Sequence, residues 1–391
     1  MSDGDPVHEV PTRRDCVKYG GAIVGGGLLA GCTGGDIEEP SGTASAGTES
    51  SDDESTEQTD TSYSVSIEPV GDVEFDSVPE TWVAGNGSWA DMGVALGLEP
   101  PEGLWIPGRY PTQFYDDIDG LSVDGEEITA LWDDGVSKEL FYELDADVHV
   151  FDPNFLVNRF DGWERSDVDE ISENIAPVFG NTSFTRGYEW HDDYRYYSMY
   201  EAFSKLAEVF RREERYEAFV ELHHGVQDSI RDVLPPEDER PEIGLVFPMD
   251  EEPDEFWGPY RLEDGTGYKQ WRDLGVNDAF DGSGLETFVS SRGTLDYETL
   301  LEYDPDVLYL YGYDDRTEAE FQESFLTYMQ DHDVASDLTA VENGDVYQGG
   351  GFYQGPITNL VLTERAAQQL YGLADELYDR QRVVDIINGE F

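Results

Sequence analysis

The sequence has few cysteines and few basic residues, and it contains no long apolar run. Its 391 residues include 2 Cys and 23 Lys plus Arg against 87 Asp plus Glu, which gives a formal net charge of −64. Two cysteines cannot form a disulfide framework, and so few cations exclude a nucleic-acid binder that works by neutralising phosphates. The sequence signatures of zinc sites, calcium loops, phosphate loops and nucleophile elbows do not occur either.

The acidic residues are spread along the whole chain. Apolar residues make up 38% of the sequence and aromatic residues 13%, which is enough for a hydrophobic core. At molar ionic strength the Debye length falls to about 3 Å, so dispersed carboxylates stop repelling one another while they keep the surface hydrated. The composition is therefore typical of a halophile's surface rather than of an acidic binding patch.

The N-terminus has the pattern of a targeting segment. Arg13, Arg14 and Lys18 precede an uncharged run, 19–31, which ends in Leu-Ala-Gly before Cys32. The run is too short and too rich in glycine to cross a hydrocarbon core of about 30 Å, which indicates an export signal. The arginine pair resembles a twin-arginine signal peptide, and the end of the run resembles a lipobox, which implies cleavage before Cys32 and lipidation of its thiol. The following residues, up to position 62, contain no Lys or Arg and predict a disordered tether.

Beyond the tether, apolar strands alternate with helical segments, and one arrangement occurs twice. Residues 139–150 align without a gap with residues 298–309, and five of the twelve positions are identical. Each copy predicts a helix, an Asp-x-Asp turn and a buried strand. Between the copies, residues 213–233 predict one long helix. The pattern therefore predicts an α/β fold with mainly parallel strands in two lobes of similar design.

In their order, these features resemble the substrate-binding proteins of ABC importers for ferric siderophores, haem and cobalamin. A C-terminal block, 338–347, with a Gly355-Pro356 helix start adds to the resemblance. It implies an α/β fold of two Rossmann-like lobes joined by a single long helix, with a ligand cleft between the lobes. The expected divisions are 1–31 for the signal peptide, 32–62 for the lipidated Cys and tether, 63–190 for the N-terminal lobe, 191–240 for the helical segment with the bridging helix, and 241–391 for the C-terminal lobe.

The resemblance also implies which residues bind the ligand. They flank the repeated elements: Trp132, Phe155 with its neighbour Asn154, Arg292, Tyr313, Arg316, Phe352 and Tyr353. Arginine is scarce in this chain and could bind an anionic chelate, which adds Arg109, and Tyr110 beside it is a further aromatic candidate. Further aromatic candidates are Trp89, Trp105, Trp190, Trp257, Tyr260 and Trp271. Two acids, Glu139 and Glu298, are expected to dock on arginines of the permease. Alternatively, they are ordinary acids at helix starts, where the macrodipole favours them.

The sequence thus predicts a monomeric, lipid-anchored receptor of a haloarchaeal ABC importer, on the extracytoplasmic face of the cell membrane. It would capture a ferric siderophore and deliver it to the permease and its ATPase, with no catalysis, no cofactor, no nucleic acid and no directly bound metal. Three alternatives stay open: a haem or cobalamin receptor of the same fold, a surface-anchored glycoside hydrolase that uses two carboxylates, and a tethered interaction domain without a ligand.

Overall fold

A computed structural model describes residues 62–132, 135–191, 193–262, 265–287, 292–312, 316–373 and 376–391. The expected signal peptide, Cys32, nearly all of the tether and the ligand-site candidate Tyr313 lie outside these ranges. None of the helices within them combines the length and the apolar character that spanning a membrane requires.

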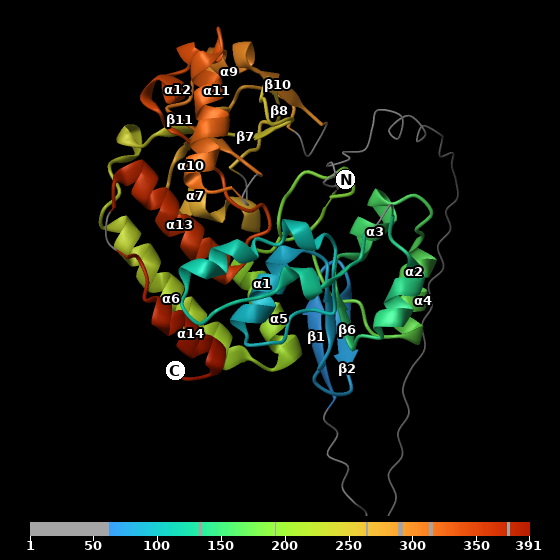
Figure 1. Cartoon of the computed structure of the whole chain (residues 1–391). Helices are drawn as coiled ribbons and strands as arrows, with labels where there is room; N and C mark the ends of the chain where they lie inside the picture. Colours follow the sequence, from blue (N-terminus) through green and yellow to red (C-terminus); the bar gives the residue numbers. More distant parts are fainter. Residues whose placement is uncertain are drawn as a thin grey trace, which may run out of the picture. The chain divides into compact units, whose positions relative to one another are not determined.

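The first sheet is parallel and follows an N-terminal hairpin (Figure 1). The hairpin consists of β1 (Tyr63–Ile67) and β2 (Gly71–Phe75). The sheet has the order β5 (Thr129–Ala130), β4 (Gly103–Leu104), β3 (Trp82–Ala84) and β6 (Val148–Val150). All residues of β3 and β6 are buried, as expected for parallel strands that are covered on both faces.

The second sheet is mixed. Its order is β10 (Thr294–Asp296), β8 (Glu255–Trp257), β7 (Glu242–Pro248), β11 (Val307–Leu310) and β12 (Val346–Gln348), and β9 (Asn277–Asp278) pairs with the start of β7. The strands β7, β9, β11 and β12 are parallel, whereas β8 and β10 pair antiparallel at the edge. The predicted α/β class with mainly parallel strands is confirmed.

The helices of the first half are α1 (Gly87–Ala95), α2 (Lys138–Leu144), α3 (Pro153–Arg159), α4 (Arg165–Asn174), α5 (Met199–Phe210) and α6 (Glu213–Arg231). Those of the second half are α7 (Lys269–Asp273), α9 (Tyr297–Tyr303), α10 (Glu318–Phe321), α11 (Thr327–Asp331), α12 (Thr339–Asn343), α13 (Pro356–Tyr371) and α14 (Arg380–Asn388). The long helix predicted over 213–233 corresponds to α6.

The repeated sequence element folds in the same way in both halves. Asp145 caps the C-terminus of α2 and Asp304 caps that of α9, and both residues have the left-handed conformation, with φ of 47° and 42°. Aspartate tolerates this conformation better than most residues do. In each copy the chain then enters a fully buried parallel strand, β6 or β11, so the predicted repeat of helix, turn and strand is confirmed.

The second aspartate of each Asp-x-Asp turn has a structural role that the sequence did not reveal. The Asp147 carboxylate accepts hydrogen bonds from the amides of Glu80 and Thr81, just before β3. The Asp306 carboxylate accepts one from the amide of Glu242, at the start of β7. Each aspartate therefore aligns its own strand with the parallel neighbour.

The chain crosses from the half with the first sheet to the half with the second sheet and later crosses back. It leaves the first half through α5 and α6, and it returns through α13, which contacts both α7 and α1. Helix α14 then lies against α1 and α6. The expected single connecting helix is therefore not confirmed, and the assignment of 241–391 to one lobe stays a prediction.

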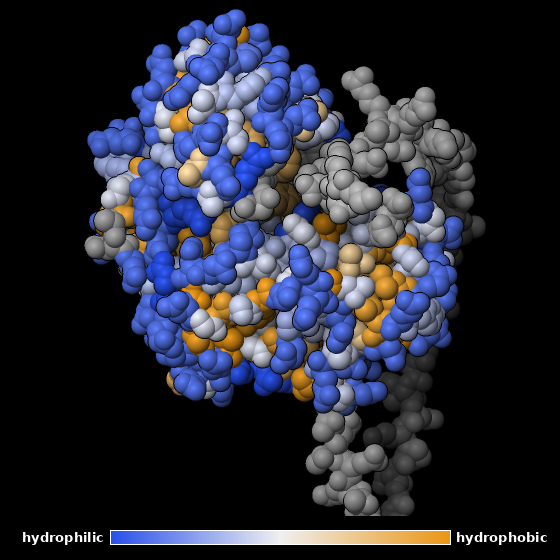
Figure 2. All heavy atoms as spheres, viewed as in Figure 1, coloured by the Kyte–Doolittle hydropathy of each residue, from blue (hydrophilic) through white to orange (hydrophobic). Residues whose placement is uncertain are grey.

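Hydrophilic residues cover most of the face drawn in Figure 2, with smaller apolar patches between them. The apolar stripe of α5 points inward instead, since Met199, Phe203, Leu206, Ala207 and Phe210 are all buried. Few acidic residues of the described ranges are buried, and Asp91 and Asp152 are two of these exceptions.

Candidate functional site

The candidate site lies where strands of both sheets end. The segment 181–197 follows Val178, which pairs in parallel with His149 of β6, and the segment 349–355 follows β12. In α/β folds, ligands bind beyond the carboxyl ends of parallel strands. Here the two segments meet, because the Phe184 ring lies 5.6 Å from the Phe352 ring and 5.1 Å from the Tyr353 ring.

Hydrogen bonds also join the two halves beside this contact. The Thr266 amide donates to the Ser183 carbonyl at 3.0 Å. The hydroxyls of Ser88, in α1, and Thr266 are 2.8 Å apart. Segments from both halves therefore have fixed positions at the candidate site.

Seven aromatic side chains form what we call the aromatic cluster: Phe155, Phe184, Tyr188, Trp190, Tyr260, Phe352 and Tyr353. The Tyr188 and Trp190 rings stack with their centroids 4.3 Å apart, and Phe155 of α3 lies 6.0 Å from Tyr188. Tyr260 contacts Phe352 at 5.9 Å. The cluster draws on three parts of the chain: α3 with the segment 181–197, the loop after β8, and the loop after β12.

Three arginines approach the tyrosines of this cluster. Burial raises the pKa of Tyr188, and the positive charges of Arg159, Arg292 and Arg109 lower it again. Burial likewise raises the pKa of Tyr260, with opposing effects from Arg109 and Arg292. Both phenols are therefore neutral near pH 7. So many cations at one place are notable in a chain with only 23 Lys and Arg.

The arginines come from different elements. Arg109 ends a short 3-10 turn, Pro107–Arg109, and Arg159 ends α3, and both are exposed. Arg292 precedes β10 and is partly buried. Among the salt bridges of the described ranges, none involves Arg109 or Arg159, whereas Arg165 pairs with Asp169. Positive charge that is not matched by a neighbouring carboxylate suits an anionic ligand.

A buried carboxylate holds the first-half part of the site together. Asp152 is 3% exposed and begins α3, where it accepts a hydrogen bond from the Asn154 amide at 2.8 Å. It also accepts bonds from the hydroxyls of Thr182 at 2.7 Å and Tyr194 at 2.6 Å. Burial raises the pKa of Asp152, and these donors oppose the rise. Asp152 therefore ties α3, which carries Phe155 and Arg159, to the segment 181–197.

A second buried carboxylate, Asp91, connects α1 with α13. It accepts hydrogen bonds from the amides of Ile357 at 2.9 Å and Thr358 at 3.0 Å, in the first turn of α13. The Tyr115 hydroxyl donates to it at 3.1 Å. Burial raises the pKa of Asp91 to about 6, and these donors oppose the rise. A β-carbon at Gly355 would lie 2.4 Å from the Asp91 carboxylate, which explains why glycine precedes this helix.

The structure brings together some of the predicted ligand residues. Phe155, Phe352 and Tyr353 belong to the aromatic cluster, and Arg109 and Arg292 act on its tyrosines. Asn154 follows the N-cap of α3 beside Phe155. Their roles in binding stay predictions.

Other predicted residues have separate surroundings. Trp132 forms a short bridge with Val136 and packs against the apolar cluster of the first sheet. Tyr110 is buried, and its hydroxyl lies 2.7 Å from that of Tyr115, although its backbone borders Gly87 beside Tyr353. Arg316 pairs with Glu251 at 2.6 Å.

Sequence reasoning missed Arg159, Phe184 and Tyr188. One signal could have found two of them, because the segment 184–197 contains six Phe, Tyr or Trp residues. Trp190 and Tyr260 were only general aromatic candidates, and the structure places both in the aromatic cluster.

The docking candidates Glu139 and Glu298 occupy the same place in the two repeats. Each is the second residue of its helix, α2 or α9, and each is exposed. The Ser137 hydroxyl donates to Glu139 at 2.7 Å and lowers the pKa of that carboxyl. The pair therefore presents two carboxylates at matching positions of the two halves.

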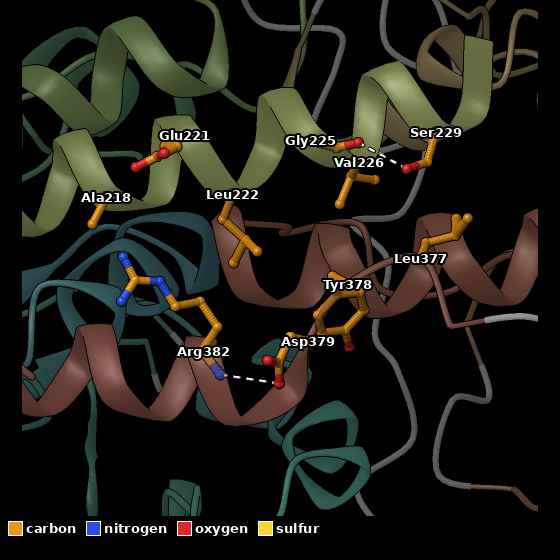
Figure 3. Close-up of a pocket in the computed structure, with 10 residues that line it drawn as sticks. All are labelled: Ala218, Glu221, Leu222, Gly225, Val226, Ser229, Leu377, Tyr378, Asp379 and Arg382. Atoms are coloured by element: carbon orange, nitrogen blue, oxygen red, sulfur yellow. Dashed lines mark hydrogen bonds between the residues drawn. The ribbon is translucent and has the colours of Figure 1, made fainter. Parts of the chain in front are cut away.

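Two surface hollows lie away from the aromatic cluster. Figure 3 shows the first, a groove of about 390 Å³ between α6 and α14 that is lined by Leu222, Val226, Tyr378 and Arg382. The second, of about 440 Å³, lies beside Arg240 and Asp306. Within the described ranges no three acidic, histidine or cysteine side chains are grouped as metal ligands.

The chain is similar to known binding proteins. Residues 151–351 match a family model described as "Periplasmic binding protein". A periplasmic binding protein from Veillonella parvula is 18% identical, with 80% of this chain and 98% of that chain covered and a TM-score of 0.55. The periplasmic catecholate-siderophore binding protein from Vibrio cholerae is 17% identical, with 78% of this chain and 99% of that chain covered and a TM-score of 0.52. A structure described as an ABC-type Fe³⁺-hydroxamate transport system from Saccharomonospora viridis is 18% identical, with 78% of this chain and 98% of that chain covered and a TM-score of 0.51.

A comparison with curated proteins finds no match. The structures share the two-lobed α/β fold of this chain, and the family model covers just over half of it. The family consists of periplasmic binding proteins and not of enzymes, which sets the hydrolase alternative aside. The chain belongs to the periplasmic binding protein family.

Proposed function

We propose that this protein is a lipid-anchored receptor that captures a ferric siderophore and delivers it to the permease of an ABC importer. The observation that carries the proposal is the aromatic cluster, in which segments of both halves meet beyond the strand ends. The positive charges of Arg109, Arg159 and Arg292 act on Tyr188 of this cluster and lower its pKa. The names of similar solved structures, which include catecholate-siderophore and Fe³⁺-hydroxamate proteins, support it.

The chemistry of the candidate site favours an anionic chelate. Ferric catecholates carry net negative charge on oxygen atoms and present aromatic rings at their edges. Guanidinium groups bind such oxygens with strong, directional hydrogen bonds, and the aromatic cluster can stack on the rings. Ferric hydroxamates of the common aliphatic type carry little net charge and have no aromatic rings, so they make neither contact well. We therefore expect catecholate-type ligands to bind more tightly.

Titration of intrinsic tryptophan fluorescence in molar KCl tests the function directly. We expect saturable quenching by a ferric catecholate with a Kd of about 1 μM or lower, which corresponds to about −8 kcal/mol. Ferric hydroxamate, haem and cobalamin are titrated in parallel. If none of the four ligands gives a saturable response, the receptor function is wrong.

We also propose that Glu139 and Glu298 dock on the permease, since each offers an exposed carboxylate at the same place in its repeat. Paired Arg–carboxylate contacts would give orientation as well as binding energy. Replacing both with lysine is expected to lower chelate-stimulated ATP hydrolysis by the reconstituted importer at least about tenfold, because like charges then face each other. The Kd for the chelate should not change.

Glu143 and Glu302 provide a matched control for this prediction. Both are exposed, and each lies one turn further along α2 or α9. The double variant E143K/E302K makes the same change in net charge and should leave the stimulation intact. Equal losses in the two double variants would mean that overall charge, and not these two positions, controls docking.

Membrane attachment through Cys32 is part of the same proposal, and it rests on the sequence alone. The variant Cys32→Ser lacks the thiol that would carry the lipid. We therefore expect it to appear in the medium of growing cells, whereas the unchanged protein stays with the membrane fraction.

A further inference from the structure

Two neighbouring side chains beside the aromatic cluster have polar atoms that make no hydrogen bond. The indole nitrogen of Trp190 and the Nε2 atom of His191 are both buried, and neither has a partner. The His191 side chain as a whole is only 8% exposed. Buried polar groups nearly always have a partner, because water cannot compensate for a missing bond. Two such atoms in consecutive residues therefore require an explanation.

Their surroundings place both residues at the candidate site. Trp190 stacks on Tyr188, the tyrosine that the three arginines approach, and its ring lies 6.3 Å from Phe155. The His191 ring is 5.2 Å from Tyr188 and 5.5 Å from Trp190. The two nitrogens thus belong to the same segment, 181–197, that Asp152 fixes in position.

The other side of the His191 ring is held firmly. The ring stacks on Tyr194 at 4.2 Å, and its Nδ1 atom lies 2.7 Å from the Tyr196 hydroxyl. When that hydroxyl donates to Nδ1, the ring hydrogen is on Nε2, which is then a donor. Burial lowers the pKa of His191 to about 4, so the ring is neutral near pH 7. His191 is therefore held in one orientation, with Nδ1 hydrogen-bonded and Nε2 without a partner.

Tryptophans elsewhere in the chain show what other roles would look like. The Trp163 indole donates to the Val136 carbonyl at 2.9 Å, so its polar atom serves the fold. The Trp271 indole also has no partner, but this side chain is 1% exposed and lies against Tyr309 in the main core. Trp190 differs from Trp163 because its N–H has no partner, and it differs from Trp271 because it is only partly buried and stacks on Tyr188 in the aromatic cluster.

We propose that the Trp190 N–H and the His191 Nε2 atom are ligand contacts, whose hydrogen bonds form only when an oxygen-rich ferric chelate is bound. This inference rests on the proposed function and adds two specificity-determining residues to it. The arginines supply charge, whereas these two atoms supply directional contacts to oxygens at the edge of the ligand. Such contacts discriminate strongly, since a ligand without the matching oxygens leaves them unsatisfied.

The variant W190F tests the first contact. Phenylalanine keeps an aromatic ring against Tyr188 but removes the N–H. If the N–H serves the ligand, the Kd for the ferric complex of 2,3-dihydroxybenzoate, measured by calorimetry in molar KCl, rises about tenfold. The melting temperature of the ligand-free protein should not fall, because no hydrogen bond is lost. If the N–H instead serves the fold, W190F should lower the melting temperature and leave the Kd unchanged.

Two control variants make this comparison sharper. W163F removes a hydrogen bond that the fold uses, so it should lower the melting temperature by about 2 °C and leave the Kd unchanged. W271F removes an unpartnered N–H from the core, and it should leave the Kd unchanged as well. Neither side chain belongs to the aromatic cluster.

His191 is tested by a pair of variants. The side chain of asparagine ends near the position of Nδ1, so H191N can keep the contact with Tyr196 while the Nε2 atom is lost. Glutamine reaches the position of Nε2. We expect H191N to weaken binding about tenfold and H191Q to restore most of the affinity.

The outcomes separate this inference from the proposed function. If the unchanged protein does not bind the ferric complex, both are overturned. If it binds and W190F and H191N bind equally well, only the ligand contacts are overturned. A loss of affinity in W190F that is accompanied by a lower melting temperature would assign Trp190 to the fold and would also overturn them.

Discussion

Replacing Asp91 with alanine is expected to lower the free energy of unfolding by about 3 kcal/mol at pH 7. The substitution leaves the amides of Ile357 and Thr358 and the hydroxyl of Tyr115 without their acceptor in a fully buried place. It also opens a small cavity between α1 and α13. Relief from burying a charge offsets part of the loss. Urea or guanidinium unfolding in molar KCl measures the difference.

The exposed residue Asp119 offers a control, because D119A removes a carboxylate from the surface and should change stability by less than about 0.5 kcal/mol. Equal values for D91A and D119A would mean that the link between α1 and α13 contributes little. A loss in D91A alone would identify the buried hydrogen bonds as its cause.

The pH dependence of the Asp91 contribution has a definite sign. The folded-state pKa is raised from 3.8 to about 6. The neutral carboxyl therefore stabilises the folded state fully below pH 4, and this contribution is lost as the pH rises through 6. The change amounts to about 3 kcal/mol. The measurement is the free energy of unfolding of the unchanged protein minus that of D91N at each pH. The other carboxylates contribute equally to both proteins and cancel in this difference.

Replacing Arg109, Arg159 and Arg292 together with glutamine is expected to weaken binding of a ferric catecholate by about a thousandfold. Each guanidinium bond to an anionic oxygen contributes about 1.5 kcal/mol, which is roughly tenfold in affinity. A ferric hydroxamate with little net charge should lose less. Molar KCl screens the long-range attraction, so the effect that remains reports direct contact.

The variant R165Q is the matched control for this prediction. Arg165 is exposed on α4 and pairs with Asp169 at 3.3 Å, and it is not among the groups that act on Tyr188 or Tyr260. Its loss removes one positive charge without a change at the candidate site. If R165Q weakens binding as much as a single change at Arg109, the arginines act only through net charge.

Local patterns in the sequence were enough to predict the repeated unit. Helix, Asp-x-Asp turn and strand lie within twelve residues, and periodicity and turn chemistry determine each part. The role of Asp306 was not predictable, because its partner is the Glu242 amide at the start of another strand. The sequence indicated that a helix starts at Gly355-Pro356. It did not show that the carboxylate of Asp91 holds the first turn of this helix, because Asp91 is 266 residues from Ile357.

The aromatic cluster was only partly predictable for the same reason. Proximity to the repeated elements indicated Phe155, Phe352 and Tyr353. Tyr188 has no such marker, and its place depends on Asp152, which bonds Tyr194 across 42 residues. Arg159 looked like an ordinary residue at the end of a helix. Tertiary contacts of this kind leave no periodic signal in a single sequence.

The double passage of the chain through α6 and α13 has a mechanical consequence. A body joined by one rod can swivel about that rod, whereas two separate crossings oppose torsion about either one. The two halves would then keep nearly the same orientation when a ligand binds, so little conformational entropy would be lost on capture, and adjustment would be limited to side chains and loops at the site.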